Sequence, residues 1–132
     1  MFNQVNGWSS RALAALRIVA GLLFLAHGVI KVFGFPAGAE PGQQELLSLF
    51  GIGGVIELIT GLLLILGLFT RPAAFIASGQ MAVAYWMFHF PNSPYPAVNG
   101  GDAAILYCFI FLYIFTAGPG AWSMDNRTAK RF

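Results

Sequence analysis

The chain has 132 residues, of which 58% are hydrophobic and only 9% are charged. A soluble domain usually carries about 25% charged residues, so this composition excludes an ordinary soluble domain and a disordered segment, and indicates an integral membrane protein. The single cysteine, Cys108, excludes a disulfide scaffold and thiol–disulfide chemistry carried by this chain alone. The net charge of +2 reflects basic residues at the ends of membrane helices, and no nucleic-acid partner is expected.

Four apolar stretches account for most of the chain. At about 20 residues for each bilayer crossing, they predict four transmembrane helices, at residues 12–33, 52–69, 72–90 and 102–117. The expected fold class is therefore all-α, an integral membrane four-helix bundle with antiparallel, up-down-up-down topology in a single domain over residues 1–132. The first stretch carries Arg17, His27 and Lys31 and lacks a small-residue cleavage site, so we expect a retained span after a short polar leader.

The three connections between these helices differ in composition. The second and third helices are joined by a tight link, in which Thr70 is the expected N-cap. The Gly- and Pro-rich link over residues 34–51 includes a segment, residues 43–50, with the pattern of a short amphipathic helix at the membrane interface. Three prolines in residues 91–101 predict a turn-rich loop.

The basic residues indicate how the chain is oriented. Only Lys31 falls on the side of the two longer loops, whereas the other side carries Arg11, Arg17, Arg71, Arg127, Lys130 and Arg131. By the positive-inside rule, both termini of this multi-pass protein should be cytoplasmic. Arg17 lies within the inner half of its span, and we expect its side chain to snorkel to the cytoplasmic interface.

Ionisable side chains inside the predicted spans mark the candidate site, because burying them is costly. With this topology one polar group lies in the outer half of the membrane, comprising His27, Lys31, Glu57, His89, Asn99 and Asp102. We expect it to form one cluster, open or nearly open to the outer side. A buried carboxylate and a histidine can exchange protons and hydrogen-bond a quinone carbonyl. The candidate quinone or proton site therefore consists of His27, Lys31, Glu57, His89 and Asp102.

Each of these residues also has a purely structural interpretation. Glu57 could form an ion pair with Lys31 or His27 that fixes the register of two helices. His89 lies at the end of a predicted helix, where an interfacial position explains it. Asp102 follows an asparagine by three residues, which is close to capping-box spacing, so its carboxylate could serve only to cap the fourth helix.

The sequence predicts no metal site and assigns no catalytic residue. Ligand-type side chains occur in the spans, but without HxxxH or CxxC spacing. A haem would require the two histidines, which lie on different predicted helices, to face each other at matched depth, and we do not expect one. No Ser–His–Asp arrangement, P-loop or dinucleotide-binding motif is present. A non-catalytic subunit is therefore the expectation.

An ordered series of short motifs runs through nearly the whole chain: Arg17-Ile18-Val19-Ala20-Gly21, His27-Gly28 with Lys31, Glu57 with Gly61, Gly67, Thr70-Arg71 with Ala73-Ala74, Asn99-Gly100-Gly101-Asp102, and Gly118-Pro119-Gly120 with Ser123 and Asp125. This series resembles the DoxX family of small four-helix membrane proteins. One departure is Asp102, where the family more often has Glu. The resemblance implies a four-helix bundle in a bacterial-type inner membrane and a link to quinone-dependent oxidoreductases.

Three functions remain open from the sequence. The resemblance and the polar cluster favour an accessory or quinone-interacting subunit of a membrane redox or electron-transport complex, with quinone as the one cofactor considered. Its partners would be the lipid bilayer and other membrane subunits or further copies of this chain. The small size, thirteen phenylalanines and glycine-lined helix faces also fit a purely structural subunit. The intramembrane charges fit a small carrier or channel, although the chain shows no internal inverted repeat.

Overall fold

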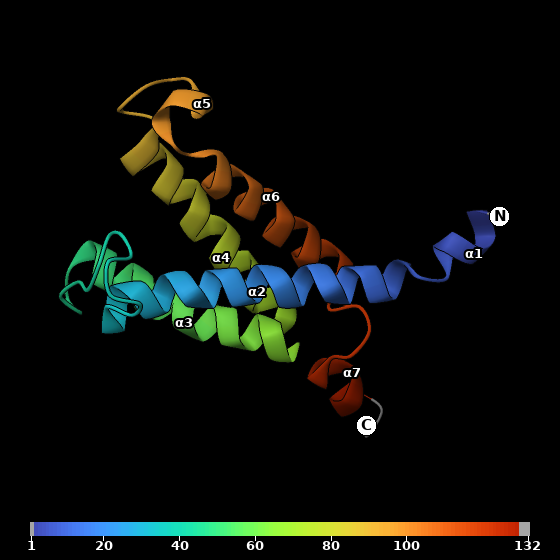
Figure 1. Cartoon of the computed structure of the whole chain (residues 1–132). Helices are drawn as coiled ribbons and strands as arrows, with labels where there is room; N and C mark the ends of the chain where they lie inside the picture. The colour runs from blue at the N-terminus through green and yellow to red at the C-terminus, as the bar shows by residue number, and fades with distance from the viewer. Residues whose placement is uncertain (1, 130–132) are drawn as a thin grey trace.

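The computed structural model describes residues 2–129, and all regular structure in this part of the chain is helical (Figure 1). In chain order the elements are α1 (Phe2–Asn6), α2 (Ser9–Phe33), α3 (Leu49–Leu66), α4 (Thr70–Ala84), the π-helical turn η1 (Tyr85–His89), α5 (Pro96–Asn99), α6 (Asp102–Ala117) and α7 (Met124–Ala129). The predicted all-α class is therefore confirmed for the described residues. Lys130 and Arg131, two of the basic residues used to predict orientation, lie outside them.

The four predicted spans correspond to α2, α3, α4 with η1, and α6. Over residues 2–129, α2 and α3 are long and apolar enough to cross a membrane, and α6 is a shorter apolar helix. The bounds of α6 agree with the predicted residues 102–117. α3 ends at Leu66, earlier than the predicted residue 69, because Gly67 takes a left-handed conformation with φ of 67° and terminates the helix.

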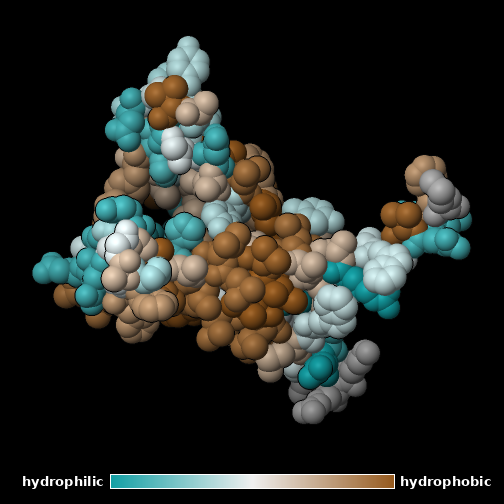
Figure 2. Space-filling view, in the orientation of Figure 1, coloured by the Kyte–Doolittle hydropathy of each residue, from teal (hydrophilic) through white to brown (hydrophobic). Residues whose placement is uncertain are grey.

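The helices are arranged as two packed pairs. α2 lies along α3, α4 lies along α6, and α3 also contacts α4. Figure 1 shows that the two pairs diverge toward the ends that carry α5 and the connection over residues 34–48. In the same orientation, Figure 2 shows the surface hollowed between these ends. The candidate site described below lies where the two pairs face each other.

Glycines bring α2 and α3 into close contact. A Cβ atom on Gly28 would lie 2.7 Å from the carbonyl oxygen of Gly54, and one on Gly61 would lie 2.8 Å from the backbone nitrogen of Leu25. Such distances leave no room for a side chain. Gly21 is also in close contact, since its Cβ would lie 3.0 Å from the Gly61 carbonyl oxygen.

The α4–α6 pair is built on small residues against large ones. Ala73, Ala74 and Ala77 of α4 are buried in one cluster with Phe111 and Ile114 of α6. Because alanine side chains are short, the aromatic and branched side chains of α6 fill the space between the helices. This packing leaves the opposite faces of both helices free of the core.

Large apolar side chains cover much of the outer surface. Figure 2 shows a continuous hydrophobic area over α2 and α3, with hydrophilic groups gathered toward the ends of the molecule. Exposed apolar residues of these two helices include Val19, Leu22, Leu23, Ile59 and Leu62. An apolar surface of this extent is typical of a helix face in contact with lipid.

Two predictions about the connections are wrong. Residues 43–50 do not form an amphipathic helix, because residues 43–48 are irregular and α3 begins only at Leu49, where the side chain of Ser48 accepts a hydrogen bond from the Gly51 nitrogen at 3.0 Å. Thr70 is not an N-cap. The N-cap of α4 is Phe69, and the orphan backbone nitrogens of Phe69 and Thr70 donate to the carboxylate of Asp125, at 2.8 and 2.9 Å.

The prediction that Arg17 snorkels is also wrong. Its side chain is 0% exposed, and its guanidinium donates to five backbone carbonyl oxygens at 2.6 to 3.2 Å, those of Leu64, Ile65, Pro119, Ala121 and Trp122. The reason lies in the chain after α6, which folds back and presents its carbonyl oxygens beside the end of α3. Arg17 therefore links α2, α3 and the C-terminal segment inside the protein.

Candidate functional site

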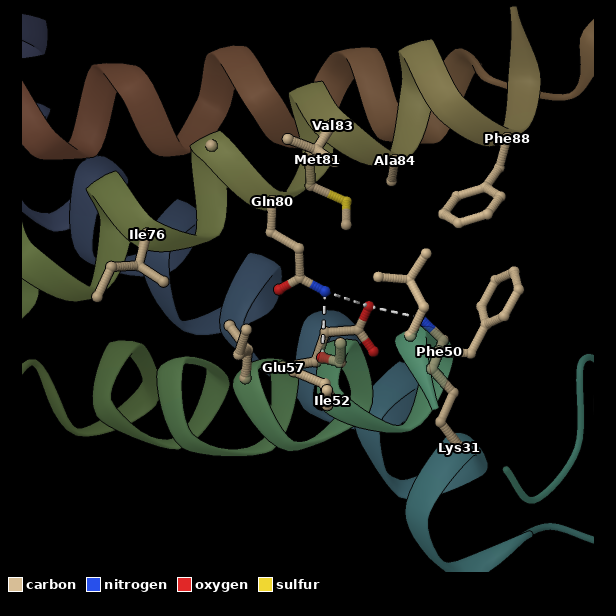
Figure 3. A pocket seen from close by; sticks show the side chains of 14 residues that line it. Lys31, Phe50, Ile52, Glu57, Ile76, Gln80, Met81, Val83, Ala84 and Phe88 are labelled. Carbon is tan, nitrogen blue, oxygen red and sulfur yellow. Dashed lines mark hydrogen bonds and ion pairs between the residues drawn. The ribbon is translucent and has the colours of Figure 1, made fainter. Parts of the chain in front are cut away.

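A buried carboxylate connects three helices at the site. Glu57 of α3 is 1% exposed. Its Oε1 atom accepts from Lys31 Nζ of α2 at 2.7 Å and from Gln80 Nε2 of α4 at 3.2 Å. The same Gln80 nitrogen donates to the Gly53 carbonyl oxygen at 3.1 Å, and Figure 3 shows its side chain reaching across from α4 toward Glu57. Of the two predicted partners of Glu57, the structure selects Lys31.

The second carboxylate oxygen of Glu57 differs from the first in its hydrogen bonding. Glu57 Oε2 is buried and has no hydrogen-bond partner among residues 2–129, and the same holds for Oε1 of Gln80. Leaving a buried polar atom unpaired costs about 1–3 kcal/mol, and more for a charged group. A polar group of a bound molecule would remove this cost at Oε2.

Two cavities adjoin Glu57. The first, here named the central cavity, has a volume of about 420 Å³, lies between the helix pairs and is lined among others by Phe24, His27, Lys31, Glu57, His89 and Tyr107. The second, here named the α3–α4 cavity, has a volume of about 330 Å³ and is lined among others by Ile52, Glu57, Ile76, Gln80 and Val83. The ion pair of Lys31 and Glu57 thus lines both the central cavity and the α3–α4 cavity.

An aromatic pair stands at the boundary of the two cavities. Phe50 and Phe88 line both, and their ring centroids are 4.6 Å apart. Figure 3 shows the two rings facing each other beside Glu57 and Lys31. Flat aromatic walls of this kind suit a planar ligand.

The two histidines lie at the central cavity, each held through its Nδ1 atom. His27 Nδ1 is 2.7 Å from the Leu23 carbonyl oxygen, and the ring lies edge-on to Tyr107 with centroids 6.1 Å apart. His89 Nδ1 is 3.0 Å from the Asn99 carbonyl oxygen. No hydrogen bond joins either described ring to Glu57. Four of the five candidate site residues therefore line the central cavity, namely His27, Lys31, Glu57 and His89.

Asp102 is the candidate that the structure places elsewhere. It is the first residue of α6, it is exposed, and it lines neither cavity. The capping interpretation of the Asn99–Asp102 sequence is also incorrect, since Gly101 is the N-cap and Asn99 Oδ1 instead accepts from the Gly101 nitrogen at 2.7 Å. That hydrogen bond holds the turn before α6.

Two residues of the site were missed by the sequence analysis. Gln80 is a lone amide within the third apolar stretch, and that isolation was a usable signal. Tyr107 carried no signal, because aromatic residues are frequent throughout the fourth stretch. The π-helical turn η1 was not foreseen either, and it carries His89, one of the residues that line the central cavity.

No metal centre is evident in the described part of the chain. Over residues 2–129, no three His, Cys, Asp or Glu side chains lie close enough to hold a metal ion together. The arrangement offers hydrogen bonding, one charged pair and flat apolar walls. Such groups can accommodate an amphipathic organic molecule.

Comparison with known proteins gives the family. The DoxX family model matches residues 12–90. An uncharacterized protein of Haemophilus influenzae is 41% identical, over 98% of this chain and 99% of the relative. An uncharacterized membrane protein of Mycobacterium tuberculosis is 31% identical, over 88% of this chain and 80% of the relative.

The inner membrane protein YqjF of Escherichia coli is 26% identical, over 88% of this chain and 91% of the relative. No solved structure matches the chain. The family match extends over more than half of the residues, and the first relative aligns along nearly the whole length of both proteins. The chain therefore belongs to the DoxX family of membrane proteins.

Proposed function

We propose that this protein binds a quinone-type ligand in the central cavity and acts as an accessory subunit of a redox or electron-transport complex in the inner membrane. The observation that carries the proposal is the buried Glu57 carboxylate, whose Oε2 has no partner in the described chain and which adjoins two cavities. An ionisable group inside a membrane helix is by default a candidate functional group.

The residues present fit a quinone headgroup and its apolar tail. Lys31 Nζ and the Tyr107 hydroxyl can donate to ligand oxygens, and Phe24 supplies an apolar wall of the same cavity. The α3–α4 cavity is almost entirely apolar, and its lining residues Ile76 and Val83 are half exposed on the outer surface. An isoprenoid tail in this cavity would reach the lipid between α3 and α4.

The proposal includes a single four-helix transmembrane domain of α2, α3, α4 with η1, and α6, in up-down-up-down order with both termini cytoplasmic. Two contacts support it. Arg71 at the start of α4 donates to the Phe115 and Thr116 carbonyl oxygens at the end of α6. Arg17 binds carbonyl oxygens of α3 and of the segment after α6. Reporter fusions at the C-terminus and in the loop over residues 91–101 test this orientation, and activity of a cytoplasmic reporter in the loop would contradict it.

The direct test is purification in a mild detergent followed by mass spectrometry of the bound lipids. We expect a stoichiometric quinone in the wild-type protein and its loss in Glu57→Gln. The matched control is Glu45→Gln, because Glu45 is an exposed carboxylate in the loop at the same end of the molecule. Wild-type protein that carries no quinone and binds none when it is added would contradict the proposal.

One observation favours a second function, that of a structural subunit. The contacts of Glu57 with Lys31 and Gln80 join α2, α3 and α4, which fixes the relative register of these helices. If this were their whole role, Glu57→Gln would impair assembly with partner subunits and leave the quinone content unchanged. The same purification therefore separates the two functions.

A further inference from the structure

The hydrogen bonds of the two histidines determine which ring nitrogen remains for a ligand. A backbone carbonyl oxygen can only accept a hydrogen bond, so Nδ1 of His27 and Nδ1 of His89 must each carry a proton to bond Leu23 and Asn99. In the neutral imidazole, the proton on Nδ1 leaves Nε2 as an acceptor with a free lone pair. Each ring therefore keeps one acceptor nitrogen, and both residues line the central cavity.

The carboxylate adds a third acceptor of the same kind. Glu57 Oε2 is buried, has no partner within residues 2–129 and belongs to a residue that lines the central cavity. Lys31 Nζ uses one of its three N–H donors on Glu57 Oε1, at 2.7 Å. The Tyr107 hydroxyl can serve either as donor or as acceptor. The buried side-chain atoms of the site that lack a partner among residues 2–129 are Glu57 Oε2 and Gln80 Oε1, and both can only accept.

A buried acceptor without a partner distinguishes the two redox forms of a quinone-type molecule. The two oxygens of the oxidised form are carbonyls, which only accept, and they would leave the buried Glu57 Oε2 atom unpaired. The two oxygens of the reduced form are hydroxyls, and each carries an O–H donor. A buried acceptor that gains a donor loses its desolvation penalty, whereas one that faces another acceptor keeps it.

We infer that the central cavity selects the reduced, hydroxyl-bearing form, a lipid-soluble hydroquinone. Its O–H groups donate to Glu57 Oε2 and to Nε2 of His27 or His89, while the aromatic walls cover the ring. The inference rests on the proposed function and adds to it the redox state of the ligand.

A set of three matched ligands tests this inference on the wild-type protein. They are 2-methyl-1,4-naphthohydroquinone, the corresponding quinone, and the dimethyl ether of the hydroquinone, which has the same ring but no O–H. Dissociation constants are measured without oxygen by calorimetry on the protein in lipid nanodiscs. We expect the hydroquinone to bind at least about tenfold more tightly than the other two, which corresponds to the net gain of one or two hydrogen bonds.

Two substitutions test which histidine is responsible for the preference for the hydroquinone. His27→Phe and His89→Phe keep a flat ring and remove the acceptor, so replacing the histidine that accepts from the ligand should lower the preference for the hydroquinone. Tyr113→Phe is the matched control, because Tyr113 is an exposed aromatic residue of α6 that lines neither cavity. This control should keep the full preference. Thermal unfolding of each variant verifies that the fold is retained.

The outcomes separate this inference from the proposed function. Equal binding of the hydroquinone, the quinone and the ether would overturn the selection of the reduced form and leave quinone-type binding intact. A preference that both histidine variants retain would overturn the assigned acceptors. Failure of all three ligands to bind the wild-type protein would overturn the proposed function together with the inference.

Discussion

Two charged side chains are buried in this small protein, one beside the C-terminal end of α3 and one midway along that helix, and their surroundings differ. Arg17 is 0% exposed, with its guanidinium bonded to five carbonyl oxygens, and it lines neither the central cavity nor the α3–α4 cavity. Glu57 is 1% exposed, yet one of its oxygens has no partner in the described chain and it lines both cavities.

The contrast teaches how to separate a structural charge from a functional one. A buried charge whose hydrogen-bonding capacity is fully used holds elements together and has nothing left to offer a ligand. A buried charge that is only half used carries a desolvation cost which other interactions must offset, and such costs concentrate at functional sites. Substitutions at the two positions should therefore have different effects: loss of stability at Arg17 and loss of ligand binding at Glu57.

The largest loss of stability is expected for Arg17→Met. Removing the guanidinium leaves several buried carbonyl oxygens bare at a cost of about 1–3 kcal/mol each, so the free energy of unfolding should fall by about 3 kcal/mol or more. Arg17→Lys should recover little of this, because an ammonium cannot reproduce the planar fork of donors. Unfolding in detergent, followed by circular dichroism, measures both.

The control for this prediction lies on the same helix. Arg11 is exposed and its guanidinium lies 4.7 Å from the centre of the Trp8 ring. Arg11→Met should change the free energy of unfolding by no more than about 0.5 kcal/mol. An equal effect of the Arg11 and Arg17 substitutions would show that the buried contacts of Arg17 do not matter to the fold.

Gly28→Ala should have the next largest effect and extends the comparison to the other end of α2. The new Cβ would lie 2.7 Å from the Gly54 carbonyl oxygen, so α2 must move away from α3. Overpacking of this kind costs about 1–3 kcal/mol, and the movement would also separate Lys31 from Glu57. Both unfolding and ligand binding should therefore be impaired.

Gly79→Ala is the matched control for that substitution. Gly79 lies on α4, and a Cβ there would meet nothing within 4 Å. Alanine in a helix interior is favoured over glycine by about 0.5–1 kcal/mol, so this variant should be slightly stabilised. If the two alanine variants unfolded alike, the close α2–α3 contact would not be a determinant of the structure.

A smaller loss is expected for Asp125→Ala, at the Arg17 end. Its carboxylate accepts from the backbone nitrogens of Phe69 and Thr70 and so caps α4 from a distant part of the chain. Removal of such a cap costs about 1 kcal/mol, and Asp125→Asn should cost less because one acceptor oxygen remains. Ligand binding should be unaffected in both variants, which unfolding and calorimetry together would check. A loss of ligand binding would mean that the region around Asp125 and Arg17 is coupled to the site around Glu57.

The sequence predicted the helices better than it predicted their ends. Hydrophobic stretches located α2, α3, α4 with η1, and α6, and those bounds depend only on local composition. The hydrogen-bond partners of Arg17 and Thr70 could not be predicted in this way. Both depend on the segment after α6 folding back against the chain, with Asp125 reaching a helix that lies 55 residues earlier. Contacts over such separations leave no local pattern.

The site was predicted in part for a similar reason. Glu57, Lys31, His27 and His89 stand out because charged or titratable groups are rare in apolar helices, so their types alone marked them. Their meeting at one cavity depends on the two helix pairs diverging, which no residue type encodes. Gln80 escaped attention because an uncharged amide contributes little to a search for ionisable groups, although it donates to the carboxylate directly.

The smallest loss of stability, and the sharpest test of the comparison, is expected for Glu57→Gln. Glutamine keeps the shape of the side chain and an oxygen that can accept from Lys31, while the charge is lost and the second oxygen becomes an NH2 group that donates. A charge-assisted hydrogen bond becomes an ordinary one at a cost of about 1 kcal/mol, and relief of the buried charge offsets part of this. Binding of the hydroquinone should nevertheless fall by about tenfold or more, because the carboxylate oxygen that accepts its O–H is gone. Unfolding and calorimetry on one preparation measure the two effects together. A variant that unfolded as readily as Arg17→Met and still bound the ligand would place Glu57 with Arg17 among the structural charges.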